Sequence, residues 1–480
     1  MSHSKILDSI FRHSVKQPGK AAFHTTDGHT VTYKQLADNV IRAASFLYAS
    51  GIRRGDRIML SAQKEIEFVY LYFGAHLAGV INVVVDSKSK MEHLRHIISV
   101  VKPAMAFGID TDVCISRQYG DFDLPDVLHD FDAGGLSDQD TADIMFTSGT
   151  TGNPKGVILT HHNVFSSADN INRFIGNTPE DIELLGLPMC HSFGLGRLRC
   201  NMLTGATVIL HNGFANIKSV FSAFEKFHVT GFGMVPAVWA YIKRLSGSRI
   251  GRYSDQIKYI EIGSAAMPLE DKELLCSLFP SARICMHYGL TEASRAVFME
   301  FHENIDDLAT AGKGVVPGVD VKILREDGSE ADPGEEGEIC VRGNMVTPSY
   351  FLPEDNENAF IDGYFRTGDW GRKSELGNIY LVARKKELIN VGGKKVSPIE
   401  IEEALEKAGV GESMCVSVPD PDGVLGEVPK ALLVEGTFDI GLEEIKKRLA
   451  ESLETYKLPK IYEVVKSVPK TASGKKQRTV

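Results

Sequence analysis

The sequence lacks paired cysteines. Its seven cysteines are odd in number, lie far apart and form no CxxC pair. A disulfide framework and a cysteine-based structural zinc site are therefore both unsupported. The first residues also lack the apolar core of a secretory signal peptide. We expect reduced, mostly buried thiols in a cytoplasmic protein.

Long hydrophobic runs and an excess of positive charge are absent as well. The most apolar window, residues 74–85, is too short to span a membrane and contains His76 and Asn82, so no integral membrane association is expected. The formal net charge is −10, which disfavours a general nucleic-acid surface. Any polyanion must therefore be bound by a local cluster. The 480 residues exceed what one compact core holds and predict two or three folding units.

Short apolar runs alternate with amphipathic helices along most of the chain, which predicts an α/β fold with largely parallel, buried sheets. One helix is expected to begin at Thr32–Tyr33 and to end at Gly51, where glycine suits a left-handed C-cap. Two more helices are expected at residues 65–79 and 90–101. Strands are expected at residues 57–61, 80–85, 104–107, 207–210, 231–235, 259–262 and 282–285.

The character of the chain changes after about residue 318. Residues 319–324 and 337–341 alternate in polarity and are separated by Asp-Gly and Pro-Gly turns, which predicts a small antiparallel β subdomain. Near residue 384 a basic segment leads to a two-glycine turn and to a helix from Pro398 to Lys407, begun by Ser397. We place a boundary there, between a large domain, residues 1–383, and a small α+β domain, residues 384–480.

A loop rich in glycine and hydroxyl residues spans residues 146–157 and reads Phe-Thr-Ser-Gly-Thr-Thr-Gly-Asn-Pro-Lys-Gly-Val. Glycines let backbone N–H groups approach a bound anion, hydroxyls add donors, and the lysine adds positive charge. The loop lacks the Gly-Lys-Ser/Thr ending of a Walker A motif. The alternative to a phosphate site is an ordinary turn. The expected phosphate contacts are Thr147, Ser148, Gly149, Thr150, Thr151, Gly152 and Lys155.

This loop resembles the characteristic loop of the adenylate-forming superfamily, which includes acyl- and aryl-CoA synthetases, peptide-synthetase adenylation domains and beetle luciferases. The resemblance covers roughly residues 30–478. It implies a large domain of stacked sheets and a mobile C-terminal domain, with a hinge at Lys386. The sequence departs from the family at Ala383, where a glycine usually precedes the motif arginine. The further motifs are Tyr288-Gly-Leu-Thr-Glu292, Gly314-Val-Val-Pro-Gly318, Tyr364-Phe-Arg-Thr-Gly-Asp369, Arg384-Lys-Lys-Glu-Leu-Ile-Asn390 and Pro469-Lys-Thr-Ala-Ser-Gly-Lys475.

The resemblance also implies roles in acyl-adenylate formation, in which a carboxylate attacks the α-phosphate of ATP and pyrophosphate leaves. Lys475 is expected to be the catalytic lysine, although a solvated lysine in a basic tail is the alternative. Glu292 is expected to bind Mg²⁺ and Thr291 to contact the α-phosphate. The alternative for these two is a helix N-cap followed by a first-turn glutamate. The other expected nucleotide contacts are Tyr288 and Gly289 at the adenine, and Asp369 and Arg384 at the ribose.

The acyl site is implied by a Pro-Met-Cys-His-Ser-Phe-Gly loop that places His191 near the substrate carboxylate. No aspartate follows it to pair an α-amine, so a simple amino acid is disfavoured. Arg197 and Arg199 are unexpected there: they pair a second substrate carboxylate, contact CoA phosphates or face solvent. Residues two apart on a helix point in different directions, so we do not expect both to serve one ligand. The expected acyl contacts are His191, Val235, Gly263, Ser264, Ala265, Ala266, Leu290 and Arg197.

The resemblance implies an ATP-dependent carboxylate–CoA ligase that uses ATP, Mg²⁺ and CoA. The acid would become an acyl-AMP with release of pyrophosphate, and then an acyl-CoA thioester. The pantetheine arm is expected to enter beside Gly392 and Gly393 after the C-terminal domain rotates. The alternative is a freestanding adenylating enzyme that loads the acid onto the phosphopantetheine of an acyl carrier protein. The cationic tail keeps this alternative open, because carrier proteins are usually acidic.

Overall fold

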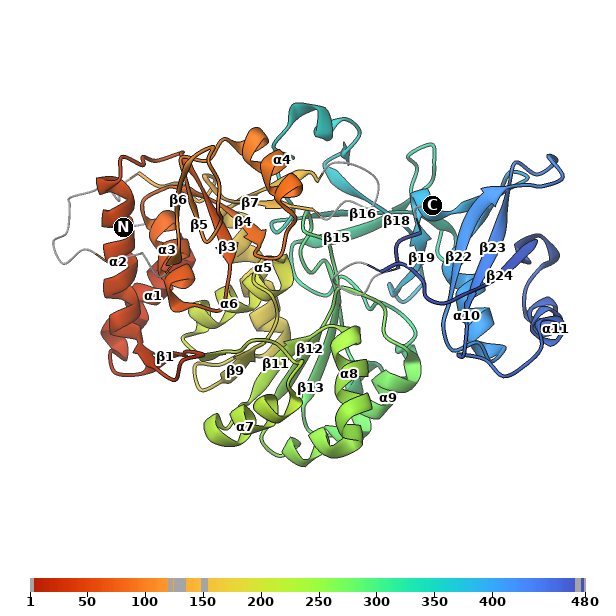
Figure 1. Ribbon diagram of the computed structural model, residues 1–480, viewed down its shortest axis with the longest axis horizontal. Coiled ribbons are helices and arrows are strands. Elements are labelled where there is room, and N and C mark those ends of the chain that lie inside the picture. The colour runs from red at the N-terminus through yellow and green to blue at the C-terminus, as the bar shows by residue number, and fades with distance from the viewer. Residues whose placement is uncertain (1–3, 120–123, 125–134, 148–153, 471–475, 479–480) are drawn as a thin grey trace. The chain divides into compact units, whose positions relative to one another are not determined.

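The computed structural model describes residues 4–119, 124, 135–147, 154–470 and 476–478. The chain forms two compact units (Figure 1). The first comprises residues 1–149, 153–320 and 341–365, and the second residues 150–152, 321–340 and 366–480. The second unit thus begins before residue 384, and it also includes residues 321–340, which interrupt the first unit in the sequence. The boundary predicted between residues 383 and 384 stays a prediction.

The first unit contains a six-stranded sheet that is parallel except for its β7–β8 pair. Its predicted strands are confirmed to within a residue or two. The helix α2 begins at a capping box formed by Thr32 and Gln35, and Gly51 has the expected positive φ of 83°. In spatial order the strands are β6 (Ile115–Arg117), β5 (Met105–Phe107), β3 (Arg57–Ala62), β4 (Ile81–Asp86), β7 (Thr141–Phe146) and β8 (Gly156–Thr160). The neighbouring helices are α2 (Tyr33–Ala49), α3 (Ile66–Leu77) and α4 (Met91–Val101).

An eight-stranded sheet forms the rest of the first unit's framework, and its six central strands run parallel. In spatial order the strands are β14 (Val297–Glu300), β13 (Arg283–Tyr288), β12 (Tyr259–Ile262), β11 (Gly231–Met234), β9 (Ile182–Leu185), β10 (Thr207–Leu210), β1 (Ala21–His24) and β2 (Thr30–Thr32). The helices of this part are α1 (Lys5–Lys16), α5 (His161–Ile175), α6 (Ser192–Thr204), α7 (Ile217–Phe227), α8 (Pro236–Ser246) and α9 (Leu269–Leu278).

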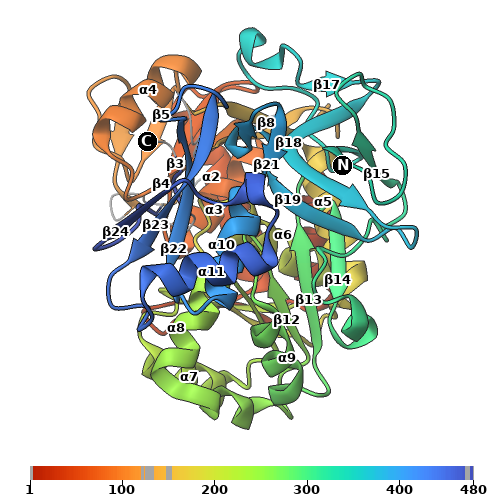
Figure 2. The same ribbon diagram turned by 90° about the vertical axis from the view of Figure 1, so that its right-hand side faces the viewer.

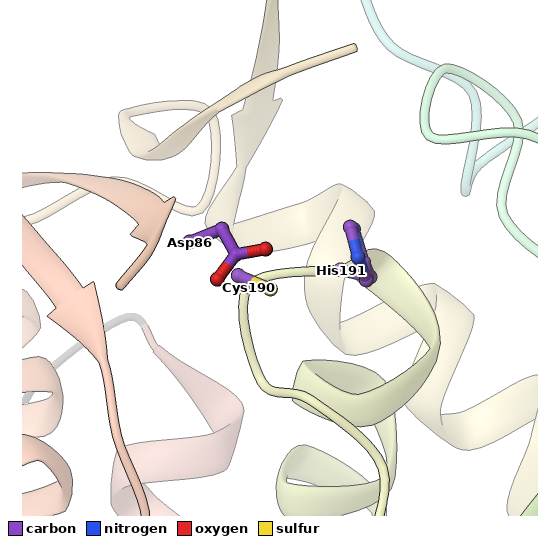
Figure 3. Close-up of side chains that lie close together, drawn as sticks. All are labelled: Asp86, Cys190 and His191. Atoms are coloured by element: carbon purple, nitrogen blue, oxygen red, sulfur yellow. The ribbon is translucent and has the colours of Figure 1, made fainter. Parts of the chain in front are cut away.

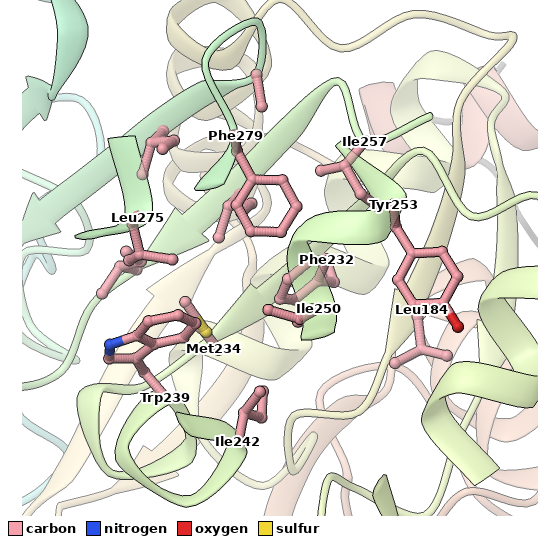
Figure 4. Close-up of a cluster of buried hydrophobic side chains, with 14 of the residues drawn as sticks. Leu184, Phe232, Met234, Trp239, Ile242, Ile250, Tyr253, Ile257, Leu275 and Phe279 are labelled. Atoms are coloured by element: carbon pink, nitrogen blue, oxygen red, sulfur yellow. The ribbon is translucent and has the colours of Figure 1, made fainter. Parts of the chain in front are cut away.

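The two faces of the eight-stranded sheet differ in chemistry, because successive side chains of a strand point to opposite faces. One face is apolar: Phe232 and Met234 of β11 pack with Trp239 and Ile242 of α8 in a fully buried cluster (Figure 4). The alternate positions of the neighbouring strands carry Glu183, Tyr259, Glu261 and His287, all buried. This opposite face therefore holds buried charge, and it leads to the candidate acyl site.

A five-stranded sheet is divided between the two units. It consists of β15 (Val319–Leu324), β16 (Glu336–Gly343), β18 (Tyr364–Lys373), β17 (Phe360–Ile361) and β19 (Ile379–Arg384). The predicted strands at residues 319–324 and 337–341 are confirmed as β15 and β16, which are neighbours in this sheet. The β17–β18 and β18–β19 pairs are antiparallel. A short 3-10 helix, Lys385–Glu387, follows β19.

The C-terminal part of the second unit is α+β. The helix α10 (Pro398–Lys407) begins at Ser397, whose hydroxyl accepts from the Glu400 N–H, as the sequence predicts. This helix and α11 (Leu442–Ser452) pack on the face of the sheet that carries Cys415 and Leu433 (Figure 2). The strands are β22 (Ser413–Pro419), β23 (Glu427–Val434) and β24 (Ile461–Val465), beside the hairpin of β20 (Ile389–Val391) and β21 (Lys394–Val396). Among the described helices, none is long and apolar enough to cross a membrane.

Candidate active site

The ends of the predicted phosphate loop lie side by side. The N–H of Thr147, just after β7, donates to the carbonyl of Lys155 at 3.0 Å, just before β8. Antiparallel pairing of β7 and β8 therefore closes the loop at its base. The expected contacts Ser148, Gly149, Thr150, Thr151 and Gly152 lie outside the described residues.

Lys155 is held by two neighbours within the first unit. Its Nζ lies 3.2 Å from Asp355 Oδ1 and 5.0 Å from the centroid of the Tyr350 ring. Both an ion pair and a cation–π contact restrict a long side chain that would otherwise move freely. Lys155 therefore contributes to the order of the loop base.

A strap of residues 346–351 joins the loop base to the turn that carries Glu292. Val157 of β8 pairs with Tyr350, and the Tyr350 hydroxyl donates to Glu292 Oε1 at 2.8 Å. The Thr347 N–H donates to the Glu292 carbonyl at 2.7 Å, and Val346 pairs with Ala293. The strap thus fixes the acidic side chain predicted to bind Mg²⁺ on the same framework as Lys155.

No helix begins at Thr291. Residues 289–295 form turns and a single β-bridge after β13, so the helix-cap alternative for Thr291 and Glu292 is wrong. Both side chains are half-buried. The strand itself runs to Tyr288, three residues beyond its predicted end at 285, and this extension carries His287 into the site.

A small pocket of about 30 Å³ lies between the start of α6 and this turn. It brings together three residues expected at the substrates, Ser264, Gly289 and Leu290. The expected acyl contacts Val235, Ala265 and Ala266 do not line it, and Gly263 lies behind His287, whose ring atoms come within 2.2 Å of where a Gly263 Cβ would stand. The polar lining residues are Ser192, Ser264, Ser294, His287 and Arg295, and the others are Phe193, Gly289 and Leu290.

Glu261 anchors the polar wall of this pocket. Its Oε1 accepts from Arg295 Nε at 3.0 Å and lies 2.9 Å from His287 Nδ1. The two guanidiniums of Arg295 and Arg197 outweigh burial and hold the pKa of Glu261 well below its usual range. Burial lowers the pKa of His287 despite the neighbouring carboxylate. The wall is therefore an ionised glutamate beside a neutral imidazole at neutral pH.

Arg197 is not a substrate contact, contrary to expectation. Its side chain is fully buried, and Glu183, Glu261 and Asn177 accept from its three guanidinium nitrogens. An Arg197 facing solvent is excluded on the same evidence. No donor fork remains for a second substrate carboxylate, and Arg197 instead neutralises the charged face of the sheet.

Arg199 is buried as well, on the other side of α6. Its Nε donates to the Tyr72 hydroxyl at 2.9 Å, and its guanidinium pairs with Asp143 of β7. His76 Nε2 lies 3.0 Å from the same carboxylate. Despite burial, Arg199 and His76 lower the pKa of Asp143 to about 2. Arg199 thus ties α6 to the six-stranded sheet and faces neither solvent nor CoA.

The loop before α6 ends in His191, whose side chain is exposed. Lys64 Nζ donates to the carbonyls of Leu185 and Leu187 at 2.8 and 2.5 Å and thereby fixes the start of this loop. Burial lowers the pKa of Lys64 to about 7 and raises that of the Cys190 thiol to about 12. Lys64 is thus only partly charged at neutral pH.

Asp86, at the end of β4, approaches Cys190 and His191 from the neighbouring sheet (Figure 3). One potential ligand atom from each residue lies within 4.8 Å of the others. The three offer carboxylate, thiol and imidazole donors at the expected acyl site. Sequence reasoning did not connect Asp86 with this loop, because the two segments are about a hundred residues apart.

In the second unit the two predicted ribose contacts lie opposite each other. Asp369 of β18 and Arg384 of β19 are register partners, and Arg384 Nε lies 2.8 Å from Asp369 Oδ1. The Asp369 N–H donates to the Thr367 hydroxyl at 3.0 Å. A carboxylate accepts and a guanidinium donates, so the pair offers both functions that a diol needs.

The remaining predicted residues lie on the C-terminal segments. Lys386 is in the 3-10 helix after β19. Gly392 and Gly393 form the β20–β21 turn with φ of 57° and 88°, conformations that glycine adopts without strain. Lys475 lies outside the described residues, while its neighbour Lys476 pairs with Glu402. The roles of all four predicted residues stay predictions.

Several polar residues of this site were missed by sequence reasoning. Tyr350 and Asp355 hold Glu292 and Lys155, and Arg295 and Glu261 form the pocket wall. The available signal was a charge inside an apolar strand: Glu261 interrupts Tyr-Ile-Glu-Ile, and Glu183 lies in Ile-Glu-Leu-Leu. A buried charge requires a partner, so these glutamates indicated arginines close by.

Comparison with known proteins agrees with this arrangement. The 2-succinylbenzoate–CoA ligase of Bacillus velezensis is 31% identical, over 93% of this chain and 92% of its own. The long-chain-fatty-acid–CoA ligase FadD13 of Mycobacterium tuberculosis is 29% identical, over 94% and 92%. The structure of o-succinylbenzoate CoA synthetase from Bacillus subtilis with its acyl-adenylate intermediate superimposes with a TM-score of 0.88 at 28% identity, over 98% and 96%.

Two family models match the chain directly. The AMP-binding enzyme model covers residues 10–351, and the model of the AMP-binding enzyme C-terminal domain covers residues 400–475. The first match alone spans well over half of the sequence. The chain is therefore a member of the AMP-binding enzyme family, within the adenylate-forming superfamily.

Proposed function

We propose that the protein is an AMP-forming carboxylate–CoA ligase. In the first step an acid oxygen bonds to the α-phosphorus of ATP, the bond to the β-phosphate oxygen breaks, and pyrophosphate leaves. In the second step the CoA sulfur bonds to the acyl carbon, its proton is lost, and AMP leaves. The observation that carries the proposal is the strap of residues 346–351, which joins Lys155 and Glu292 beside a pocket for the acid.

The chain would contribute positioning and charge rather than covalent chemistry. The phosphate loop closed by Thr147 and Lys155 would hold the phosphates, with Thr291 at the α-phosphate. Glu292 supplies a carboxylate oxygen, which is the donor type that Mg²⁺ prefers, and would bind the cation that accompanies ATP. The bound cation would neutralise charge on the leaving pyrophosphate. The Bacillus subtilis relative has been solved with ATP and magnesium.

The second unit would complete each half-reaction in turn. Asp369 and Arg384 would hold the ribose hydroxyls, while Lys475 would contact the carboxylate and the α-phosphate during adenylation. Rotation about Lys386 would then withdraw Lys475 and bring the Gly392–Gly393 turn to the site. A glycine turn permits the close passage of a thin pantetheine arm.

Pyrophosphate release tests the proposal. The purified protein is incubated with ATP, Mg²⁺ and single acids from a panel of fatty, aryl, dicarboxylic and amino acids, with and without CoA. We expect turnover with at least one acid to become catalytic only when CoA is added. Glu292→Gln should lower adenylation by roughly 10²–10³-fold, as removal of a charge-stabilising group does. Glu270→Gln, an exposed glutamate of α9, should leave it unchanged.

Two results would change the assignment. Acid-dependent release that CoA does not accelerate, but that a phosphopantetheinylated acyl carrier protein does, would establish the carrier-loading alternative. Release that depends on no acid would refute the ligase reaction altogether.

A further inference from the structure

The acyl pocket is walled by hydrogen-bonding groups rather than by hydrocarbon. Ser192, Ser264 and Ser294 contribute hydroxyls, and His287 and Arg295 complete the polar side. An aliphatic tail in such a pocket would displace the water that hydrogen-bonds to these groups and would form no hydrogen bonds in its place, which costs free energy. The lining therefore disfavours a fatty acyl chain.

The wall is built into the fold. Arg295 and His287 are 2% and 8% exposed, and both contact Glu261. A Cβ at Gly263 would lie 2.2 Å from His287 ring atoms, and one at Gly196 would lie 2.5 Å from Arg295 Nη1. The two glycines thus leave the space that both side chains occupy.

Two lining residues also hold a backbone conformation that side chains rarely adopt. Ser264 and Arg295 have φ of 75° and 58°. Non-glycine residues in this region are uncommon and cluster at functional sites. Both residues line the pocket, and Arg295 is held there by Glu261 and by the carbonyls of Ser192 and Phe193.

The charge balance of the buried face disfavours a second carboxylate on the substrate. Two carboxylates, Glu183 and Glu261, pair with two guanidiniums, Arg197 and Arg295, and burial lowers the pKa of His287. An additional anion would therefore enter without a counter-charge, which is costly in a buried site.

Most N–H groups of the Arg295 guanidinium already donate to acceptors within the protein. Its Nε donates to Glu261, and its terminal nitrogens donate to the carbonyls of Ser192 and Phe193 and to the Ser294 hydroxyl. No two-pronged donor remains for a carboxylate. The pocket therefore does not offer the usual recognition of an anion by arginine.

A hydroxyl group matches what the wall leaves available. His287 Nδ1 lies 2.9 Å from Glu261 Oε1, so we assign the proton to this atom, which makes Nε2, on the ring edge beside Gly263, the acceptor nitrogen. The Ser294 oxygen accepts from Arg295, and its own O–H can donate. A substrate hydroxyl can donate to one and accept from the other, whereas a carboxylate or a methyl group cannot do both.

We propose that this pocket selects a carboxylic acid bearing an uncharged hydroxyl group, with His287 and Ser294 as the residues that recognise it. The inference rests on the proposed ligase function.

Matched acid pairs test the proposal through ATP–pyrophosphate exchange, which reports the first step without CoA. The pairs are lactate and propanoate, 3- or 4-hydroxybutanoate and butanoate, and 4-hydroxybenzoate and benzoate, with succinate and decanoate as further probes. We expect one hydroxy acid to exceed its unsubstituted partner at least tenfold in kcat/KM. A site built around a hydroxyl rejects the analogue that lacks it strongly.

Substitutions of the two proposed recognition residues test whether they cause the preference for the hydroxy acid over the unsubstituted acid. Ser294→Ala should reduce the preference for the hydroxy acid, measured as the ratio of the two kcat/KM values, at least about fivefold. His287→Phe should also reduce the preference for the hydroxy acid over the unsubstituted acid. Ser281→Ala, an exposed turn residue outside the site, should change neither acid. Because Ser294 is only half-buried, its variant keeps the test valid if His287→Phe does not fold.

Three distinguishable outcomes would contradict the hydroxyl preference, the assigned residues or the ligase function. Faster exchange with decanoate, succinate or the unsubstituted acids would overturn the hydroxyl inference and leave the ligase function intact. A preference for the hydroxy acid that survives Ser294→Ala and His287→Phe would overturn the assigned residues. Exchange with no acid at all, from folded protein, would remove the proposed function and this inference with it.

Discussion

Replacing Arg197 by methionine should destabilise the first unit severely, because it would leave two buried carboxylates with one guanidinium. Arg197, Glu183 and Glu261 are each at most 1% exposed, and Arg197 contacts both glutamates. Breaking a buried ion pair by removing one partner costs about 3–5 kcal/mol. At roughly 1–2 °C per kcal/mol for a folding unit of this size, Arg197→Met should lower the Tm by about 3–10 °C.

Charge compensation separates this explanation from simple loss of packing. The double variant Arg197→Met/Glu183→Gln removes one charge of each sign, so Glu261 keeps Arg295 as its partner. We expect it to be more stable than Arg197→Met alone by at least about 1 kcal/mol, a coupling typical of contacting residues. Urea unfolding of the single and double variants, with Glu183→Gln as the third corner, measures the coupling. A double variant no more stable than Arg197→Met would refute the argument from charge.

Three further predictions concern catalysis and pH. Lys475→Ala should lower acyl-adenylate formation by roughly 10²–10³-fold and should spare thioester formation from supplied acyl-adenylate. The control Lys470→Ala should affect neither step. Equal loss of both steps in Lys475→Ala would contradict the role of Lys475 in adenylation alone. Lys386→Pro should spare adenylation and slow thioester formation by stiffening the hinge, and unimpaired thioester formation would argue against rotation there. Burial lowers the pKa of His161 to about 3, so its unfolded form binds a proton first and the free energy of unfolding should fall as pH drops from about 6.5 towards 3, by up to about 1.4 kcal/mol per unit. His161→Gln should flatten that slope in urea titrations, and an unchanged slope would contradict the depressed pKa.

Much of the fold follows from local patterns. The strands at Arg57–Ala62 and Tyr259–Ile262 and the helix at Pro398–Lys407 lie at or within a residue of their predicted bounds. The helix has a capping serine, and each strand carries isoleucine among mostly apolar residues. The end of β13 was missed by three residues, because Met286, His287 and Tyr288 extend the strand by pairing with β14, a partner that the local pattern does not reveal.

The site was only partly predictable. Sequence motifs indicated Glu292 and Lys155, since the motif itself carries the chemistry. They did not indicate Tyr350, which reaches Glu292 from 58 residues away, and they led to the wrong interpretation of Arg197. A charged residue near a motif resembles a ligand-binding residue. Its true partners, Glu183 and Glu261, become visible only when three strands and a helix are assembled.

The charged face of the eight-stranded sheet constrains how the pocket can be redesigned or can diverge. On the apolar face, one hydrocarbon side chain can replace another of similar volume at small cost. On the charged face, any single change of Glu261, Arg295 or Arg197 to a neutral residue leaves an unmatched buried ion. New acid specificity would therefore be reached through compensated pairs of substitutions, or through Ser294 and Ser264, which carry no charge. Libraries that vary the serines and hold the ions fixed should yield the larger fraction of folded, altered enzymes.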